Sequence, residues 1–394
     1  MSDTAQSILE TVRRVVGDRD GFVPLHEPEF AGNEAAYVAD CIETGWVSSV
    51  GAYVDRFEKD LAAFTGVGHA VATMNGTAAL HIALLLAGVK PGDEVLMPTL
   101  TFVATANATA YAGATPHFVD SESETLAVDP IALERHLAAT CEMRGDQCYN
   151  RQSDARIGAL IVMHAFGHPA KLDELVALCA RWHIPLVEDA AESLGSSYKG
   201  KHTGQFGLIA ALSFNGNKVM TTGGGGAILT NDPVLAKRAK HLTTTARVPH
   251  RWNFVHDEIG FNYRLPNLNA ALGCAQLERV PEMLARKRVL AQRYEEAFAQ
   301  LDGLRFLSEP QDASSNYWLC TLLLDRADVV VHEQVLEALN DADLMARPVW
   351  TLMHRLTMFA NSPRADLACA EDLAARIINI PSSPNLVGPP GSGQ

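Results

Sequence analysis

Between about residues 70 and 230 the pattern of hydrophobic and polar positions alternates between short strand-like runs and helical stretches. Short apolar runs at 94–98, 157–166, 184–189 and 208–214 have the length and composition of buried strands. Between them, residues 77–88, a segment starting near Thr101, and residues 172–182 repeat apolar side chains at helical spacing. Apolar strands separated by helices predict a mostly parallel sheet covered on both faces, in which ligands bind at the carboxyl ends of the strands.

After Arg264 the pattern changes. Residues 267–301 predict one or two long amphipathic helices, and the remainder to about residue 380 mixes strands and helices as a smaller second domain would. The polar segment 141–156 predicts an exposed excursion between a helix and a strand. The pattern therefore divides the chain into an N-terminal helix or arm (1–22), a large α/β domain (23–265), a long helix with a small C-terminal α/β domain (266–386) and a Gly/Pro-rich flexible tail (387–394).

Composition and charge exclude several classes of protein. The chain has 394 residues, of which 47% are hydrophobic and 20% charged, so it can bury a large core and is not disordered. The formal net charge of −14 argues against nucleic-acid binding, and no apolar run approaches the roughly 20 residues of a membrane span. Residues 1–18 lack the apolar stretch of a secretory signal, so we expect a cytoplasmic protein. Seven cysteines occur without a CxxC pair and no HExxH occurs, so we expect free thiols and no metal.

Two residues of opposite charge are predicted at neighbouring strand ends. Asp189 ends the strand at 184–189, where a carboxylate is costly without a cationic partner. The alternative is a helix cap, a role that aspartate fills well. Lys218 follows the strand at 208–214 in a short loop, where an amine that is partly neutral can form a Schiff base with an aldehyde. The alternative for Lys218 is an ordinary solvated lysine.

Two further motifs suggest an aromatic phosphate ligand. The sequence NGTAALH (75–81) predicts a turn opening a helix near Thr77, whose N–H groups and positive dipole end could bind a phosphate, although an ordinary capped helix has the same pattern. Phe102 follows a strand end and could lie on an aromatic ring or simply belong to the core. The glycines at 223–226 match neither GxGxxG nor a Walker A motif, which disfavours a nucleotide phosphate loop.

Taken in order, the motifs resemble the DegT/DnrJ/EryC1/StrS family of pyridoxal-phosphate sugar aminotransferases over about residues 23–384. The resemblance rests on NGTAALH (75–81), PTLTFVATANA (98–108), HAFGHPAKLDEL (164–175), VEDAAESLGS (187–196), SFNGNKVMTTGGGGAI (213–228) and HDEIGFNYRLPNLNAALGCAQL (256–277). It implies fold type I of the pyridoxal 5'-phosphate (PLP)-dependent transferases, which is the fold of aspartate aminotransferase. That fold has a large, mostly parallel sheet domain and a smaller C-terminal α/β domain. The resemblance also implies bound PLP and a homodimer with active sites shared across the interface.

The resemblance assigns a role to each matching position. Lys218 is expected to hold the cofactor covalently and to move a proton between the cofactor and the sugar carbon. Asp189 is expected to pair with the pyridinium nitrogen, which keeps the cofactor a strong electron sink. Phe102 is expected to stack on the ring. Glu192 stands where relatives often carry Gln or His near the ring hydroxyl, and this departure leaves its role open.

The remaining assignments concern the phosphate and the substrates. The expected phosphate contacts are Thr77, Ala78 and Ser213 of one subunit, with Asn262 and Arg264 reaching in from the neighbouring subunit. The candidate substrate contacts are His164, Trp350 and His354, the two histidines having a core role as their alternative. The cations that could offset the negative net charge for a nucleotide sugar are Arg264, Arg347 and Lys199.

Within the family, GGGG (223–226), the polar segment near Cys148, RPVWTLMH (347–354) and RIINIPSS (376–383) resemble the branch of the bacillosamine and legionaminic acid pathways. The expected reaction moves an amino group from L-glutamate to C4 of a UDP-2-acetamido-2,6-dideoxy-4-keto-hexose, in two half-reactions, for lipopolysaccharide or other glycan synthesis. The alternatives are GDP-4-keto-6-deoxymannose, a dTDP-3-keto sugar, or a PLP-binding regulatory protein without turnover. Relatives that dehydrate the sugar at C3 carry histidine in place of the lysine, and Lys218 argues against that reaction.

Overall fold

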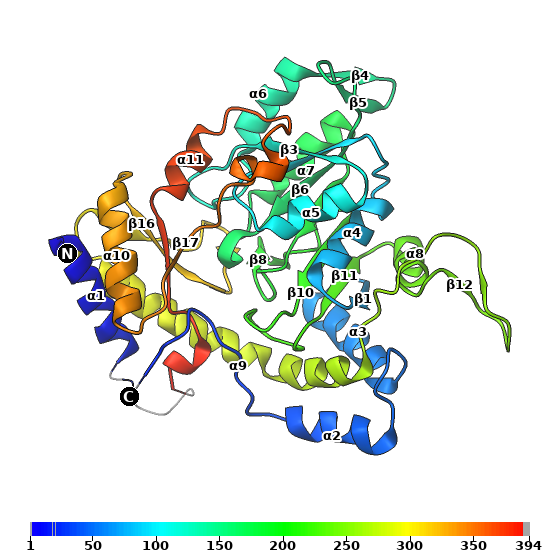
Figure 1. Ribbon diagram of the computed structural model, residues 1–394, viewed down its shortest axis with the longest axis horizontal. Coiled ribbons are helices and arrows are strands. Elements are labelled where there is room, and N and C mark those ends of the chain that lie inside the picture. Colours follow the sequence, from blue (N-terminus) through cyan, green and yellow to red (C-terminus); the bar gives the residue numbers. More distant parts are fainter. Residues whose placement is uncertain (1, 18, 20, 389–394) are drawn as a thin grey trace.

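The computed structural model describes residues 2–17, 19 and 21–388, and its large domain is built around a seven-stranded sheet (Figure 1). The strands lie in the order β1 (His69–Thr73), β11 (Gly226–Thr230), β10 (Ile209–Ser213), β7 (Leu186–Asp189), β6 (Ile157–Met163), β2 (Glu94–Pro98) and β3 (Thr115–Val119). Strand β11 is antiparallel to β1 and β10, whereas the pairs from β10 through to β3 are parallel. The prediction of a mostly parallel sheet is confirmed.

Helices cover both faces of this sheet, so its strands are apolar on both sides. In β10, Ile209 and Ala211 pack into the core on one face, and Ala210 and Leu212 pack into the core on the other. The first face is covered by α4 (Gly76–Leu86), α5 (Val103–Tyr111) and α8 (Pro233–Thr243). The second face is covered by α3 (Ala52–Thr65), α6 (Pro130–Thr140), α7 (Leu172–Trp182) and the first half of α9 (Asn267–Phe298), with α2 (Glu34–Thr44) packed on α9.

Strand register brings the candidate chemistry to one edge of the sheet. Asp189 pairs with Met163 of β6 on one side and with Ala211 of β10 on the other, so these three strands end together. The strand expected at 157–166 is shorter than predicted. It ends at Met163 because Phe166, in the short η1 helix (Ala165–Gly167), has a left-handed φ of 56°.

The small domain combines a four-stranded antiparallel sheet with helices from both ends of the chain. Its sheet has the order β14 (Leu304–Phe306), β16 (Cys320–Leu324), β18 (Ile377–Ile380) and β17 (Arg347–Pro348), with α10 (Val329–Asp341) and α11 (Ala368–Ala374) beside it. Helix α1 (Asp3–Val16) shares this core, where Ile8 and Val12 join Leu290 of α9 and Val335 of α10. The N-terminal helix predicted within 1–22 is present as α1, and its apolar face is part of the small-domain core.

Two surface segments can be compared with their predictions. The segment 141–156 is the predicted excursion between a helix and a strand and is exposed at most of its positions. It contains a β-hairpin of β4 (Cys141–Arg144) and β5 (Gln147–Asn150), in which the side chains of Cys141 and Cys148 are buried. All seven cysteines are free thiols, as predicted. Val387, where the flexible tail was predicted to begin, is buried, and most of that prediction falls on residues 389–394, which lie outside the described part of the chain.

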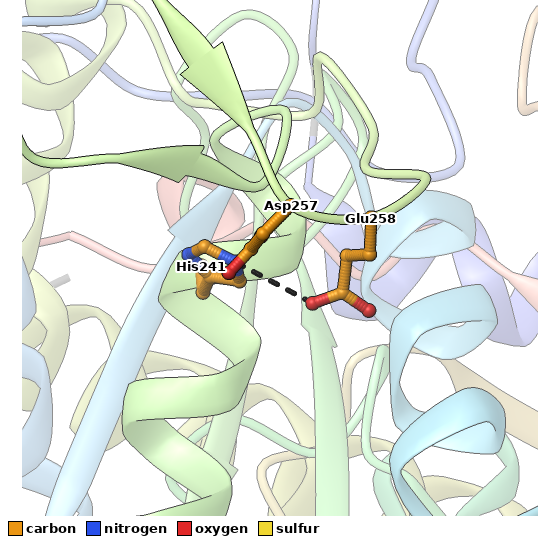
Figure 2. A group of neighbouring side chains, drawn as sticks. All are labelled: His241, Asp257 and Glu258. Atoms are coloured by element: carbon orange, nitrogen blue, oxygen red, sulfur yellow. Dashed lines mark hydrogen bonds and ion pairs between the residues drawn. The ribbon is translucent and has the colours of Figure 1, made fainter.

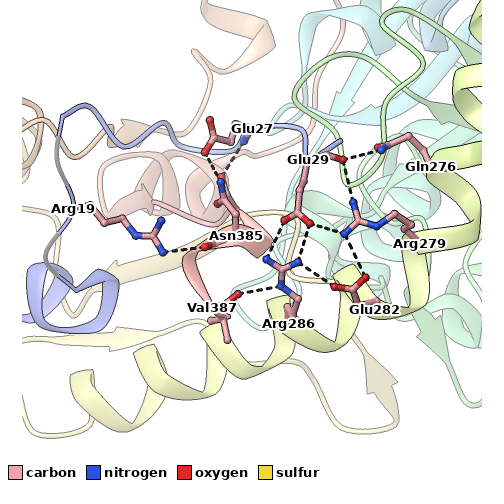
Figure 3. A network of polar contacts seen from close by, with 10 residues as sticks. Arg19, Glu27, Glu29, Gln276, Arg279, Glu282, Arg286, Asn385 and Val387 are labelled. Atoms are coloured by element: carbon pink, nitrogen blue, oxygen red, sulfur yellow. Dashed lines mark hydrogen bonds and ion pairs between the residues drawn. The ribbon is translucent and has the colours of Figure 1, made fainter. Parts of the chain in front are cut away.

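An ion-pair network fixes the segment before α2 onto α9 and the C-terminal segment (Figure 3). The Glu29 carboxylate accepts from Arg279 Nη2 at 2.5 Å and from Arg286 Nη1 at 2.9 Å. Arg286 Nε also donates to the carbonyl of Val387 at 3.0 Å, and Asn385 Nδ2 donates to Glu27 Oε1 at 2.6 Å. Residues 23–33, which run past the small-domain sheet, are therefore anchored on two sides.

Short strands complete the fold. A three-stranded sheet joins β15 (Ala313–Ser314), β8 (Ser197–Tyr198) and β9 (Lys201–His202). Strands β12 (Arg247–Val248) and β13 (Val255–His256) form a hairpin arm that projects from the body at the right of Figure 1. Its apolar side chains face solvent, with Trp252 67% and Phe254 76% exposed. Among the described residues, no helix combines the length and apolar character that crossing a membrane requires.

Candidate active site

A cavity of about 250 Å³ lies at the carboxyl ends of the parallel strands, between the two domains. It collects the predicted residues Thr77, Phe102, Asp189, Glu192, Ser213, Lys218 and Trp350. These side chains come from α4, α5, β7, β10, the loops after β7 and β10, and the segment after β17. The prediction that the strand ends gather the chemistry is confirmed for this set.

Asp189 is a buried carboxylate at the end of β7, only 3% exposed. One oxygen accepts a hydrogen bond from Thr105 Oγ1 at 2.8 Å, and the other accepts from the Ala191 N–H at 3.2 Å. A turn rather than a helix follows, so the helix-cap alternative is wrong. Burial raises the pKa of Asp189, against the hydrogen bonds and the positive charge of Lys218. Within the described chain no cation lies in ion-pair distance, so a positively charged ligand group would stabilise this carboxylate.

Lys218 points into the same cavity and is held by two groups. Its Nζ lies 3.1 Å from Glu192 Oε1 and 3.7 Å from the centre of the Trp318 ring. The second oxygen of Glu192 accepts from the Phe166 N–H at 2.9 Å. Burial raises the pKa of Glu192 to about 7, although the charge of Lys218 opposes this. Glu192 can therefore take up or release a proton near neutrality, directly beside the lysine amine.

Two glycines let the start of α4 approach the sheet closely. A Cβ on Gly76 would lie 2.8 Å from Ser213 Cβ, and one on Gly226 would lie 2.6 Å from the backbone of Asn75. Ser213 and Thr77 consequently line one end of the cavity at the α4 N-terminus, the geometry of an anion seat. Ala78 does not fit its predicted phosphate role as well, because its N–H donates to Asn75 Oδ1 at 2.8 Å.

Two aromatic rings form a wall of the cavity. Phe102, at the start of α5, is 48% exposed, and its ring centre lies 6.2 Å from that of Trp350. Trp350 in turn lies 5.1 Å from Phe166. An aromatic side chain half-exposed at a cavity wall leaves a face for a flat ligand, so stacking on Phe102 stays a prediction.

The two predicted substrate histidines are structural. His164 is fully buried, its Nε2 lies 3.1 Å from Glu188 Oε2, and its Nδ1 accepts from the Ala170 N–H at 3.2 Å. His354 Nδ1 lies 2.8 Å from Thr99 Oγ1, and its Nε2 lies 3.1 Å from Glu371 Oε1. Neither ring lines the cavity, so the core alternative holds for both and the substrate prediction is corrected.

The other predicted polar residues do not line this cavity. Asn262 and Arg264 form backbone bridges to Thr244 and Thr73, outside the cavity of their own chain. Lys199 is exposed and paired with Asp173, which corrects its candidacy for the nucleotide sugar. Arg347 lines a second cavity next to the first.

Trp318 lines the first cavity but was not predicted from the sequence, because its apolar sequence neighbours are typical of a core segment.

His241, Asp257 and Glu258 form a surface group at the base of the arm (Figure 2). His241 Nε2 lies 2.7 Å from Asp257 and 3.4 Å from Glu258. Glu258 also pairs with Arg238, whose charge already compensates this carboxylate. The group is accounted for as a surface ion-pair cluster.

The comparison with known families decides the identity of this site. The model of the DegT/DnrJ/EryC1/StrS aminotransferase family matches residues 28–389. The chain belongs to this family. Putative pyridoxal phosphate-dependent aminotransferase EpsN of Bacillus subtilis (strain 168) is 39% identical over 366 residues, covering 92% of this chain and 91% of EpsN. GDP-perosamine synthase of Escherichia coli O157:H7 is 37% identical over 365 residues, covering 93% and 94%.

Solved structures agree. The aminotransferase TlmJ from Streptoalloteichus hindustanus superposes with a TM-score of 0.82 at 29% identity, covering 92% of this chain and 94% of TlmJ. This DegT-family chain is therefore a PLP-dependent sugar aminotransferase of fold type I, as predicted, and acts in a nucleotide-sugar pathway.

The cavity fits the cofactor of this DegT-family enzyme. Asp189 is a buried carboxylate that has no cation at ion-pair distance among the described residues. The α4 N-terminus with Ser213 is suited to a phosphate, and Lys218 supplies the amine that would hold the aldehyde. Bound there, PLP supplies an electron sink for the carbon that exchanges its amino group. With PLP in place, Asp189 would stabilise positive charge on the ring nitrogen, Lys218 Nζ would move the proton, and Glu192, 3.1 Å from that amine, would exchange a proton with it.

Proposed function

We propose that the enzyme transfers an amino group from L-glutamate to C4 of a nucleotide-linked 4-keto-6-deoxy sugar, with UDP-2-acetamido-2,6-dideoxy-4-keto-hexose as its substrate. The observation that carries the transamination is the placement of Lys218, Glu192 and Asp189 in one cavity. The UDP substrate is supported by the segments 347–354 and 376–383, and by Trp350 of the first of these at the cavity wall. The product would enter lipopolysaccharide or another surface glycan.

GDP-4-keto-6-deoxymannose is the second candidate substrate. It is supported by the 37% identity to a GDP-perosamine synthase across nearly the whole chain. Both candidates share the keto group at C4 and the 6-deoxy position, so they require the same chemistry and differ in the base and in the group at C2.

A panel of keto sugars tests the proposal. The enzyme is loaded with PLP and mixed with L-glutamate and, in turn, the UDP-linked, the GDP-linked and a dTDP-3-keto sugar, and the products are identified by mass spectrometry. We expect an amino sugar from the UDP substrate. Product from the GDP substrate alone would move the assignment to the second candidate, and product from neither would refute C4 amination.

We further propose a homodimer in which the arm and the segment that follows it, up to Arg264, complete the partner's site. The support is the exposed apolar surface of the arm at Trp252, Phe254 and Ile259, which this chain leaves uncovered, and the position of Arg264 just beyond it. Subunit complementation tests this arrangement. Lys218→Ala and Arg264→Ala are each expected to be inactive, but co-refolded mixtures should recover activity, since one site of a mixed dimer is intact. No recovery in a mixture that does form mixed dimers would contradict shared sites.

A further inference from the structure

A second cavity of about 370 Å³ adjoins the first on the small-domain side. The two cavities share Asn217, Trp318 and Trp350 as walls. The other walls of the second cavity are mostly apolar, and two side chains with ionisable groups, His26 and Arg347, interrupt them. None of the roles assigned so far to the cofactor or to the catalytic amine uses these two residues.

Neither ring nitrogen of the buried His26 imidazole has a partner at hydrogen-bond distance among the described residues, and the residue is only 8% exposed. Leaving such groups unpaired costs stability, so their presence at a cavity wall indicates a missing ligand. Burial lowers the pKa of His26 well below its ordinary value, and the charges of Lys287 and Lys218 lower it further, whereas the nearby backbone of Asn217 acts in the opposite direction. The ring is therefore neutral and offers one N–H donor.

The backbone on either side of His26 is fixed. The Leu25 carbonyl accepts from the Ser382 N–H at 2.8 Å, and the Glu27 N–H donates to Ser383 Oγ at 2.9 Å. The contact between Glu27 and Asn385 adds a third tie, which is visible in Figure 3. The imidazole is thus held at the cavity by a rigid frame, which is what a binding group requires.

Arg347 supplies positive charge to this cavity. It lies on β17 at the edge of the small-domain sheet, where it is exposed. Its guanidinium has no carboxylate within ion-pair distance among residues 2–17, 19 and 21–388, and its one hydrogen bond, to the Ala346 carbonyl, is long at 3.5 Å. Apart from Lys218, it is the only lysine or arginine in the described walls of the two cavities.

We infer that the second cavity binds a carboxylate of the amino-acid donor, and of the 2-oxo acid that the donor becomes, through the Arg347 guanidinium and the His26 imidazole. The inference rests on the proposed function, in which an amino acid enters the same site as the sugar. A guanidinium matches a carboxylate through two parallel N–H bonds, and the apolar walls strengthen such a pair. The N–H of the His26 ring, at the wall of the same cavity, gives the carboxylate a further donor.

The diphosphate of the sugar substrate fits this cavity less well. A volume of about 370 Å³ is near the lower end of the ~300–1,000 Å³ of small-ligand pockets, and a nucleoside diphosphate would need most of that range. One guanidinium beside a neutral ring also leaves the two charges of a diphosphate undercompensated, whereas it matches a single carboxylate.

The test separates donor binding from sugar binding. Arg347→Gln removes the positive charge, and Arg347→Lys keeps the charge but loses the paired N–H donors of the guanidinium. His26→Phe keeps a ring of similar shape but removes both ring nitrogens. Arg355→Gln is the matched control, since Arg355 is exposed nearby and pairs with Glu371 instead. The first measurement is the calorimetric Kd of 2-oxoglutarate for the PLP form of the enzyme, with which it cannot exchange an amino group. The second is KM for L-glutamate and for the keto sugar.

We expect Arg347→Gln to weaken 2-oxoglutarate binding and raise KM for L-glutamate roughly 10- to 100-fold, with KM for the keto sugar within about threefold of wild type. His26→Phe should show a smaller loss in the same two values, and Arg347→Lys should recover part of the loss. An unchanged Kd in Arg347→Gln would overturn the inference, and so would a rise in KM for the sugar instead. Failure of the proposed function has a different signature, since wild type would then bind 2-oxoglutarate normally but aminate none of the sugars.

Discussion

Replacing Asp189 by Asn removes one charge from the base of the cavity and almost nothing else. The carboxylate is buried between Thr105 Oγ1, 2.8 Å away, and the Ala191 N–H, 3.2 Å away. An asparagine of the same size can accept one of these hydrogen bonds and donate the other to the threonine hydroxyl. Because the variant also removes a buried carboxylate that lacks a cation, the cofactor-free enzyme should unfold at the wild-type temperature or above it.

The cost should appear only when the cofactor is bound. A unit charge about 4 Å from the ring nitrogen contributes on the order of 4 kcal/mol at an effective dielectric of about 20. That energy corresponds to about 3 pK units, so the ring nitrogen of the variant should lose its proton at neutral pH. If the protonated ring is needed for the electron sink, the half-reaction with L-glutamate should slow by up to about 1,000-fold.

The assay is the single-turnover conversion of bound PLP to its amine form by L-glutamate, followed by absorbance at full cofactor occupancy. Asp173→Asn is the control, since Asp173 is an exposed carboxylate whose partners, Lys199 and Tyr198, lie outside the cavity. A rate in Asp189→Asn within about threefold of wild type would refute the electrostatic role, because a lost interaction of this size cannot leave the barrier unchanged.

Three further predictions concern the same cavity. Borohydride should fix the cofactor mass on the Lys218 peptide of wild type and on no peptide of Lys218→Ala; a label elsewhere in wild type would contradict the assignment. Gly76→Ala should weaken PLP binding and lower the free energy of unfolding, each by about 1–3 kcal/mol, because the new Cβ would lie 2.8 Å from Ser213 Cβ. The control is Gly224→Ala, whose Cβ would meet open space and whose melting temperature should equal that of wild type. The pKa of Glu192 rises from 4.5 to about 7 on folding, so between these pH values the native state holds a proton that the unfolded state releases. The free energy of unfolding should therefore fall by up to about 3 kcal/mol as the pH rises from about 4.5 to above 7. Denaturant unfolding of Glu192→Gln should lose that slope, and an unchanged slope would place the titration elsewhere.

The sequence pattern predicted an element correctly where the structure of that segment depends mainly on its own residues. Helix α7 and strand β2 have the predicted bounds, because each is set by apolar periodicity and by turn residues at its ends. Asp189 and Lys218 were found because their charge is costly at a strand end, which is visible without knowing the partners.

The errors arose where the fold, and not the local sequence, brings the deciding partner into contact. His164 is satisfied by Glu188 and the Ala170 N–H, and His354 by Thr99 and Glu371, pairings that no sequence spacing shows. The place of α1 in the small-domain core depends on helices nearly 300 residues away. His26 gave no signal for the opposite reason, since an unpaired imidazole can be recognised only after every neighbour is known.

Helix α9 packs into the cores of both domains. Its first half packs against Phe57 and Leu61 of the large domain, and its last turns, at Leu290 and Tyr294, belong to the small domain. Pro281 lies inside the helix near the end of its contact with the large domain, which extends to Met283, and it cannot donate the hydrogen bond to the preceding turn. The weakest point of the helix that joins the two domains is therefore about two to three turns before the apolar small-domain contacts begin at Leu290, and a change in the angle between the domains would bend the helix in this region.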